Sequence, residues 1–259
     1  MKAAIIGGTG LYELDFLKNA EEKIIDTEYG ETKVLIGNKA DREIVFLPRH
    51  GMAHSALAYQ VNYKANMKAL EKLGIKKVFA TCAVGSLNKN MGVGDLVLVD
   101  QFMDLAWNRE STFGEYSVNM TEPYCAAMRE YYLKAAQRAE VDIHPEGNMI
   151  VTGGPRYETA LEVQIFKSWG IDVVGMTNST EASLARELGM CYSVVTVVTD
   201  MAAGMTDVEP DLALHKKVFK DNIEKIKRLL EEAVMLVEFD GSECSCQEFY
   251  KKAVAARKK

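Results

Sequence analysis

The segment Gly7-Gly8-Thr9-Gly10 carries residue types that are well suited to binding an anion. It follows a short apolar run, Ala3–Ile6, which predicts a buried strand that breaks into a tight turn. Glycines in such a turn let backbone N–H groups surround an anion, and the hydroxyl of Thr9 adds a further donor. The segment therefore indicates either a dinucleotide site or a pocket for free phosphate.

The spacing of the glycines distinguishes these two sites. A dinucleotide-binding turn needs the pattern G-x-G-x-x-G, followed by a helix and by an acidic residue roughly 20 positions on. Counted from Gly8 and Gly10, the third glycine position is Glu13, an acidic residue where a pyrophosphate should approach. Counted from Gly7, the second glycine position is Thr9. The spacing favours a phosphate pocket, whose other walls must come from elsewhere in the chain.

Apolar runs indicate the elements that position this pocket. Runs of strand length recur at Ala3–Ile6, Ile44–Leu47, Val78–Ala83, Leu96–Val99, Met149–Val151, Asp172–Val174 and Ser193–Val198. Helical patterns cover Tyr63–Lys72, Pro123–Glu140, Thr159–Trp169, Glu181–Leu188 and Leu212–Val237. Strands without polar alternation are typical of a sheet covered by helices on both faces. We therefore expect an α/β fold with a mixed, mostly parallel sheet flanked by helices.

Signals at the element ends refine this expectation. Pro123 suits the first turn of its helix, whereas Gly170 and Gly189 suit C-terminal caps. Residues Trp107–Asn119 show no clear period and predict a long loop. The sequence contains no internal repeat and no Pro-rich linker. We expect a single domain over residues 1–259, with a helical tail from about residue 240.

Polar residues follow the predicted strands, at the sheet edge where α/β proteins bind ligands. Besides Thr9, they are Arg49 and His50 with His54 close behind, Ala83–Ser86, Gly153–Thr159, Gly175–Thr177, and Thr199 with Asp200. Together they supply hydroxyls, a guanidinium and an imidazole for an oxyanion, and an aromatic ring with two carboxylates for a planar nitrogenous group. This combination indicates a phosphate site beside a heterocycle.

At this point a family resemblance is clear. In chain order the motifs are IIGGTGLY, PRHG followed by His54, VNYKAN, TCAVGSL, GDLVLVDQF, TEPYC, GPRYET, GMT with EASLARELG, and VVTD. From Ile5 to about Leu230 the chain resembles the methylthioadenosine phosphorylase and purine nucleoside phosphorylase family of the trimeric type. The resemblance implies a distorted mixed sheet, a homotrimer or a hexamer of two trimers, and active sites near subunit boundaries. It also implies no metal and no cofactor, with inorganic phosphate as co-substrate.

The resemblance assigns roles by position. It places Thr9, Arg49, His50, Ala83 and Thr177 at the phosphate site, Met176, His54 and His215 around the ribose, and Tyr157, Glu158 and Asp200 around the base. His54 falls near the 3′ side of the sugar, and His215 falls where nucleoside phosphorylases hold the 5′-hydroxyl. Asp200 lies near purine N7, where it can donate or share a proton as the base leaves, and is the expected catalytic residue.

The sequence leaves open which purine the substrate carries. Asp200 is the methylthioadenosine-type residue, because a carboxylate accepts from a 6-amino group, but Ala202 replaces a second aspartate of adenine-type members. Glu158 is the oxopurine-type residue, suited to accept from N1–H. We expect a 6-aminopurine substrate, S-methyl-5′-thioadenosine or adenosine. The alternative is a 6-oxopurine nucleoside (inosine or guanosine) or S-methyl-5′-thioinosine.

The sequence also leaves open the 5′ substituent of the sugar and the residue at which the helix over Glu181–Leu188 begins. His215 favours an ordinary 5′-hydroxyl, whereas its neighbours Leu212 and Leu214 could line an apolar slot for a methylthio group. Thr180 stands where the family usually has proline, which indicates a shifted helix start. A non-catalytic nucleoside-binding protein is disfavoured, because the phosphate-site residues are all present.

Composition narrows the partners and the compartment. A net charge of −6 with dispersed basic residues argues against nucleic acid, and no apolar run reaches membrane-spanning length. The N-terminal apolar run is too short for a signal peptide, so we expect a cytoplasmic protein.

The five cysteines fall into two groups. Cys82, Cys125 and Cys191 sit among apolar neighbours and are expected to be small buried hydrophobes. Cys244 and Cys246 form a C-x-C pair, expected to be either two partly exposed thiols or a local disulfide. A metal site is not expected, because no further cysteine or histidine is nearby in the sequence.

Overall fold

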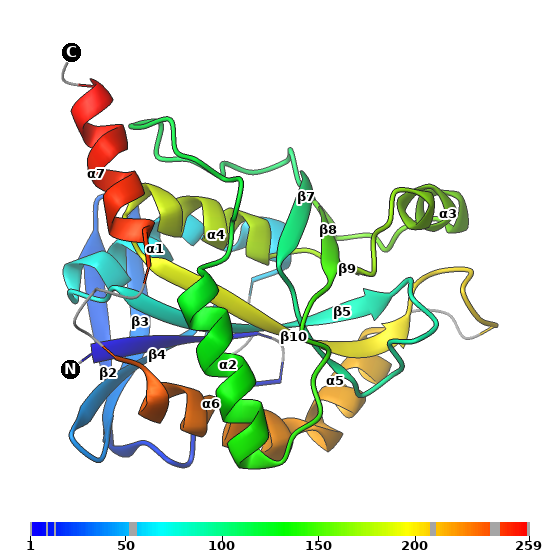
Figure 1. Ribbon diagram of the computed structural model, residues 1–259, viewed down its shortest axis with the longest axis horizontal. Coiled ribbons are helices and arrows are strands. Elements are labelled where there is room, and N and C mark those ends of the chain that lie inside the picture. Colours follow the sequence, from blue (N-terminus) through cyan, green and yellow to red (C-terminus); the bar gives the residue numbers. More distant parts are fainter. Residues whose placement is uncertain are drawn as a thin grey trace.

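A single ten-stranded sheet organises the chain in the order β2-β3-β4-β1-β5-β9-β8-β7, with β10 pairing both β5 and β6 (Figure 1). The computed structural model describes residues 2–8, 10–12, 14–51, 56–207, 211–238 and 244–257. The strands are β1 (Lys2–Gly7), β2 (Lys18–Thr27), β3 (Gly30–Lys39), β4 (Arg42–Pro48), β5 (Lys77–Ser86), β6 (Leu96–Leu98), β7 (Gln101–Leu105), β8 (Asn148–Thr152), β9 (Val173–Gly175) and β10 (Cys191–Met201).

The sheet is mixed, as predicted. Strand β1 runs parallel to β4 and β5, β10 runs parallel to β5, and β8 runs parallel to β7 and β9. The antiparallel pairs are β2–β3, β3–β4, β5–β9 and β6–β10.

Helices cover both faces of this sheet (Figure 1). They are α1 (Tyr63–Lys72), α2 (Ala126–Ala139), α3 (Ala160–Ser168), α4 (Asn178–Glu187), α5 (Leu212–Asp221), α6 (Ile223–Leu236) and α7 (Cys246–Arg257), with a short 3-10 turn at Ala58–Gln60. One apolar cluster joins the sheet to α1 and α4, and a second joins it to α2, α5 and α6. Side chains of β1 alternate between the two clusters, because successive residues of a strand point to opposite faces.

The sheet divides at β5, where the partner strand on one edge changes. On one edge it pairs with β10 along its whole length. On the other edge it pairs with β1 as far as Ala80 and with β9 only from Gly85. No described strand pairs with this edge between residues 81 and 84. The strands on either side therefore diverge there, which opens the sheet beside the loops that follow β1 and β4.

All seven predicted strands are present, and the structure contains three further strands that the sequence did not indicate. Strands β2 and β3 form a hairpin whose residues are largely polar and exposed, so no apolar run marks them. Strand β7 is also mostly outside the core. Strand β10 extends through Asp200 to Met201, beyond the predicted end at Val198, with a register shift between Val198 and Asp200.

The helix predictions need three corrections. The expected helix over Leu212–Val237 is two helices, because Asn222 ends α5 and begins α6. Pro123 precedes α2, whose N-cap is Cys125. Helix α4 begins at Asn178 rather than at Glu181. The predicted long loop at 107–119 is present, and Gly170 and Gly189 end their helices with φ values of +79° and +64°.

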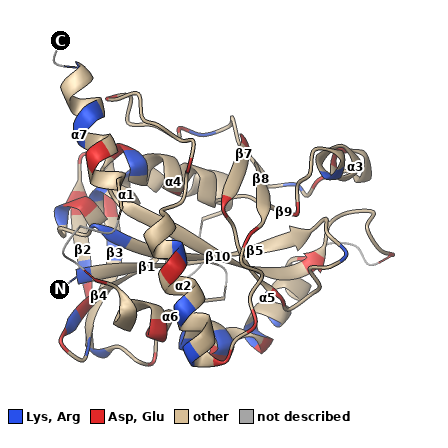
Figure 2. Ribbon diagram, viewed as in Figure 1, with Lys and Arg blue, Asp and Glu red and all other residues tan. Residues whose placement is uncertain are grey.

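Charges and cysteines complete the description. Acidic and basic residues are interspersed along α6 and the β2–β3 hairpin (Figure 2). All five cysteines are free thiols, and Cys246 is buried rather than exposed. Within the described ranges, no helix combines the length and apolar character needed to cross a membrane.

Candidate active site

A cavity of about 190 Å³ opens at the fork of the sheet. Its walls come from β5, from the segments after β4 and β9, from β10, from the loop before α3, and from the first turn of α5. Every predicted site residue that the structure describes lines it, namely Arg49, His50, Ala83, Tyr157, Glu158, Met176, Thr177, Asp200 and His215. Thr9 and His54 lie outside the described residues.

One end of the cavity is built around Arg49, which is buried directly after β4. Its Nε and Nη2 donate to the two carboxylate oxygens of Glu181 on α4, at 2.5 and 2.8 Å. Its Nη1 donates to the carbonyl of Thr81 on β5, at 2.8 Å. The hydroxyl of Tyr192 donates to Glu181 at 2.7 Å and holds the carboxylate from behind. Three strands and one helix therefore fix the guanidinium in one orientation.

This arrangement keeps Arg49 charged in the interior. Burial opposes the charge, but the attraction of Glu181 outweighs it and raises the pKa of Arg49 above its usual value. A guanidinium carries five N–H donors, and Glu181 and Thr81 accept three of them. One N–H on Nη1 and one on Nη2 remain for a further acceptor.

Two further polar groups lie at this end. The Nδ1 of His50 lies 2.9 Å from the carbonyl of Ala56, which must accept from it, and this contact orients the ring. Thr177 precedes α4, so the positive end of that helix faces the same space. Among the described residues, the buried Thr177 hydroxyl finds no better partner than the weak thiol of Cys82. We expect these groups to form an anion site.

Gly8 packs directly against the buried arginine. A Cβ at this position would lie 2.7 Å from Arg49 Nη1 and 2.9 Å from the carbonyl of Thr81, closer than real contacts allow. The Gly8 N–H also donates to the Thr81 hydroxyl at 3.4 Å. Gly8 belongs to the glycine turn identified from the sequence. It therefore lies against Arg49, and its position leaves no room for a side chain.

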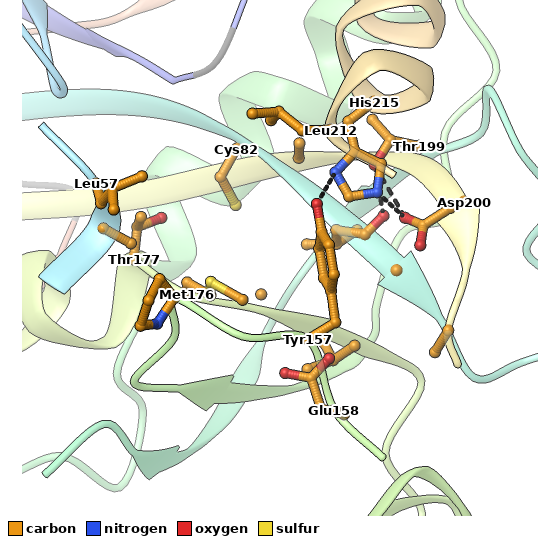
Figure 3. Close-up of a pocket in the computed structure, with 18 of the residues that line it drawn as sticks. Leu57, Cys82, Tyr157, Glu158, Met176, Thr177, Thr199, Asp200, Leu212 and His215 are labelled. Atoms are coloured by element: carbon orange, nitrogen blue, oxygen red, sulfur yellow. Dashed lines mark hydrogen bonds and ion pairs between the residues drawn. The ribbon is translucent and has the colours of Figure 1, made fainter. Parts of the chain in front are cut away.

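Met176 forms the middle of the cavity. It lies between Thr177 and Tyr157 in Figure 3. A Cβ on Gly154, whose φ is +59°, would lie 2.6 Å from the Met176 sulfur, so the loop backbone packs directly on the thioether. A thioether gives a polarizable floor that makes no strong hydrogen bond.

The far end contains an aromatic ring, an imidazole and a carboxylate (Figure 3). Nε2 of His215 lies 3.1 Å from Oδ1 of Asp200, and its Nδ1 lies 3.5 Å from the hydroxyl of Tyr157. The rings of Tyr157 and His215 meet edge to face with centroids 5.4 Å apart. His215 thus contacts two groups that the resemblance assigns to the base, although it was expected at the 5′-hydroxyl.

Glu158 is the second carboxyl group at this end. The hydroxyl of Thr152 donates to its Oε1 at 2.7 Å. Burial raises the pKa of Glu158 above its usual value, because the ionised form is poorly solvated there, and the hydrogen bond from Thr152 only partly offsets this. A neutral Glu158 therefore persists to higher pH than an ordinary glutamate.

Sequence reasoning missed some of these features. Ala83 and Asp200 lie inside β5 and β10, whereas both were expected at or beyond strand ends. Glu181 was not expected to act in the site, although it stands in the motif EASLARELG. Leu212 lines the cavity as expected, whereas Leu214 is not among its described walls. Leu57 also lines it, from a surface turn that carried no signal.

Comparison with known proteins agrees with this fold. Residues 2–235 match the model of the phosphorylase superfamily. The chain is 40% identical to the 6-oxopurine nucleoside phosphorylase of Pyrococcus furiosus, over 97% of this chain and 98% of the relative. It is 37% identical to the S-methyl-5′-thioadenosine phosphorylase of Thermofilum pendens, over 95% of each chain.

A solved structure gives the same result. The chain superimposes on the methylthioadenosine phosphorylase from Schistosoma mansoni in complex with adenine with a TM-score of 0.91 and 31% identity, covering 99% of this chain and 98% of the other. The fold and the sequence define a pentosyltransferase. The chain belongs to the phosphorylase superfamily, in the group of purine nucleoside and methylthioadenosine phosphorylases.

The Arg49–Glu181 pair generates a first prediction. Glu181→Gln leaves the arginine without its charge partner, so we expect the KM for phosphate to rise by about tenfold or more, with a smaller change in the KM for nucleoside. Steady-state kinetics with each substrate varied in turn measures this difference.

The matched control is Glu248→Gln, which breaks the exposed pair with Lys252 on α7 and should leave both KM values unchanged. Circular dichroism checks that both variants fold. Equal effects of Glu181→Gln on the two KM values, in a folded protein, would contradict a specific role for Arg49 at the anion site.

Proposed function

We propose that this protein cleaves the N-glycosidic bond of purine nucleosides with inorganic phosphate and releases the free base and a pentose 1-phosphate. One observation carries the proposal. A single cavity has the buried Arg49 at one end, two carboxyl groups at the other, and the thioether of Met176 between them. An anion, a sugar and a base fit this order.

The chemistry follows from the order of these groups. Cleavage passes through a ribosyl cation, with phosphate approaching one face of the sugar while the purine leaves from the other. Arg49, His50 and Thr177 hold the phosphate, whose charge stabilises the cation. Asp200 faces the departing base and shares a proton with its N7 as negative charge accumulates there.

The two carboxyl groups favour a 6-aminopurine. The carboxylate of Asp200 accepts from the 6-amino group, and Nε2 of His215 lies 3.1 Å from its Oδ1. Adenine N1 is an acceptor, so it needs a donor, and a neutral Glu158 provides one. The raised pKa of Glu158 favours this state. We therefore propose adenosine or S-methyl-5′-thioadenosine as the substrate.

A 6-oxopurine is the second candidate, and the relatives favour it. Several relatives of about 40% identity are named 6-oxopurine nucleoside phosphorylases. An ionised Glu158 would accept from N1–H of hypoxanthine or guanine. The 6-oxo group would then face Asp200, and two acceptors in contact cost about 1–3 kcal/mol unless one of them is protonated. Because of this cost, a 6-oxopurine is the less favoured substrate.

The cavity also has an apolar wall. Leu57 and Leu212 line it and remain 47% and 44% exposed. They can cover a 5′-methylthio group, whereas His215 can accept or donate to a 5′-hydroxyl. Since His215 already contacts Asp200 and Tyr157, the apolar wall favours the methylthio substrate.

A substrate panel tests the reaction class. We expect phosphate-dependent release of base from S-methyl-5′-thioadenosine and adenosine, and slower release from S-methyl-5′-thioinosine, inosine and guanosine. Initial rates are measured by chromatography with and without phosphate. Equal release of base without phosphate would identify a nucleosidase that uses water, and no release under any condition would leave a binding protein.

Exchange of the carboxylate at position 200 tests its contact with the base. Asp200→Asn adds an amide donor that can bind a 6-oxo group, so the ratio of inosine to adenosine turnover should rise by about tenfold or more, while the rate with adenosine falls. Asp221→Asn, a surface change on α5 at the pair with Lys217, is the control and should leave the ratio unchanged. An unchanged ratio in Asp200→Asn would contradict the proposed contact.

The protonation of Glu158 predicts a pH dependence. Its neutral form serves adenosine and its ionised form serves inosine, so the ratio of kcat/KM for adenosine to that for inosine should fall as pH rises through the raised pKa of Glu158. The ratio removes the effect of phosphate ionisation, which both reactions share. Glu158→Gln should give a flat ratio. A flat ratio in the unsubstituted protein would exclude this role.

We further propose that the protein is a homotrimer. Large apolar side chains stand exposed at α3 and on the loop after β7, namely Leu161 at 65%, Trp169 at 54% and Trp107 at 85%. Exposed apolar side chains of this size favour a subunit interface. Light scattering coupled to size-exclusion chromatography should give three times the chain mass, or six times for paired trimers. Leu161→Glu with Trp169→Glu should reduce this mass, and a monomeric unsubstituted protein would contradict the proposal.

A further inference from the structure

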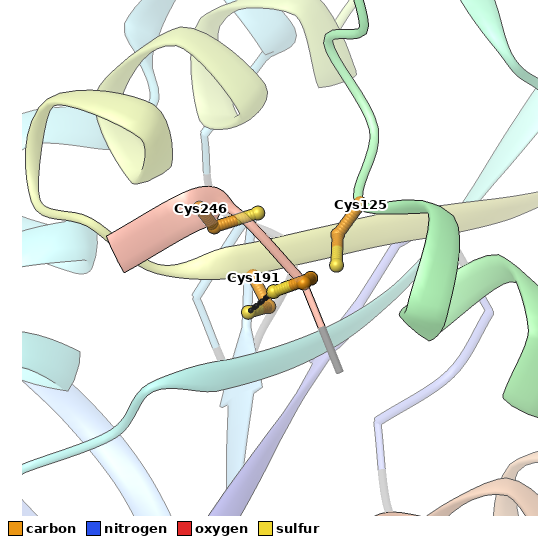
Figure 4. A group of neighbouring side chains, drawn as sticks. Cys125, Cys191 and Cys246 are labelled. Atoms are coloured by element: carbon orange, nitrogen blue, oxygen red, sulfur yellow. Dashed lines mark hydrogen bonds between the residues drawn. The ribbon is translucent and has the colours of Figure 1, made fainter. Parts of the chain in front are cut away.

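Four of the five cysteines meet at one place, outside the lining of the cavity described above (Figure 4). Cys125 precedes α2, Cys191 begins β10, and Cys244 and Cys246 lie at the start of α7. Their sulfur atoms all lie within 4.8 Å of one another, and those of Cys191 and Cys244 are 3.3 Å apart. No further cysteine lies near the C-x-C pair in the sequence. Folding brings Cys125 and Cys191 to it.

We propose that Cys125, Cys191, Cys244 and Cys246 bind one zinc ion in a closed structural site. Zinc prefers four thiolates at about 2.3 Å in a tetrahedron, which places neighbouring sulfur atoms about 3.8 Å apart. The four sulfur atoms lie within 4.8 Å of one another, so small side-chain shifts would bring them to this spacing. Soft thiolate ligands select zinc over magnesium or calcium.

The surroundings suit the charge of such a site. Four thiolates and one zinc ion carry a net charge of −2, which needs compensation in the interior. The Nη1 of Arg186, which is buried at the end of α4, lies 3.6 Å from the sulfur of Cys246. The Nη2 of Arg186 donates to the carbonyls of Glu122 and Pro123, just before Cys125, so the guanidinium is held in place.

Two helices add to this compensation. Cys125 is the N-cap of α2 and Cys246 is the first residue of α7, so the positive ends of both helices face the sulfur atoms. Helix N-termini stabilise thiolates. Three of the cysteines are buried and Cys244 is half-buried, which leaves one side of the group near solvent, where the ion can enter.

The bound ion would fasten α7 to the rest of the molecule. Residues from α2, β10 and the start of α7 contribute ligands, whereas in the described part of the chain α7 otherwise packs mainly against α4. Removal of the ion should therefore lower the melting temperature and free α7 for proteolysis. Asp200 lies at the opposite end of β10 from Cys191, so the site is structural rather than catalytic.

Metal content is the first test. The full chain, purified with a reductant and without chelator, should contain about one zinc per chain by plasma mass spectrometry. Cys125→Ser and Cys246→Ser should each lose most of the zinc. Cys82→Ser changes a buried cysteine outside the group and should retain it. Zinc content that is equal in all three variants would overturn the proposal.

Cobalt substitution keeps the test independent of variants that fail to fold. Unsubstituted protein stripped with a chelator and titrated with Co²⁺ should show thiolate-to-cobalt charge transfer and the visible bands of a tetrahedral site, which saturate at about one ion per chain. Absence of both would overturn the proposal. So would two disulfides found by intact mass in protein alkylated at lysis, because oxidised sulfur atoms cannot ligate the ion.

Discussion

The buried ion pair between Arg49 and Glu181 is the interaction on which the site depends. It joins the end of β4 to α4, and the contacts with Thr81 and Tyr192 extend it to β5 and β10. Removing one partner from such a pair typically costs about 3–5 kcal/mol, because a buried charge is left alone. The pair is therefore better understood as a device that fixes the guanidinium than as a source of stability.

The fork in the sheet provides the space for that guanidinium. Where β1 has ended and β9 has not yet begun, one edge of β5 is available to Arg49 and to Gly8. A continuous sheet would have filled this edge with another strand. Because of the same divergence, Met176, just past β9, and Asp200, on β10, line one cavity together with Arg49. The distortion of the sheet and the position of the site have a common cause.

Local patterns made the centre of the fold predictable, and tertiary packing decided the rest. The strands that carry the site are apolar on both faces, so their runs were visible, whereas β2 and β3 are exposed and polar. The glycine turn and the polar residues after each strand indicated the cavity. The roles of Glu181 and Cys244 were not visible in local patterns, because they depend on residues more than a hundred positions away, Arg49 and Cys125 respectively.

The two ends of the cavity differ in how freely they can vary over evolutionary time. At the end around Arg49, Gly8 leaves no room for a side chain, and Arg49 is hydrogen-bonded to Glu181 and Thr81, so a substitution at either position would disrupt the packing. At the proposed base end, Glu158 lies in the loop before α3, whereas Asp200 and Ala202 lie together at the end of β10. Under the proposed function, substitutions at these positions would change the contacts with the purine and leave the contacts of Arg49 in place. Relatives of similar identity are named for different purines, a 6-oxopurine nucleoside in one case and S-methyl-5′-thioadenosine in another.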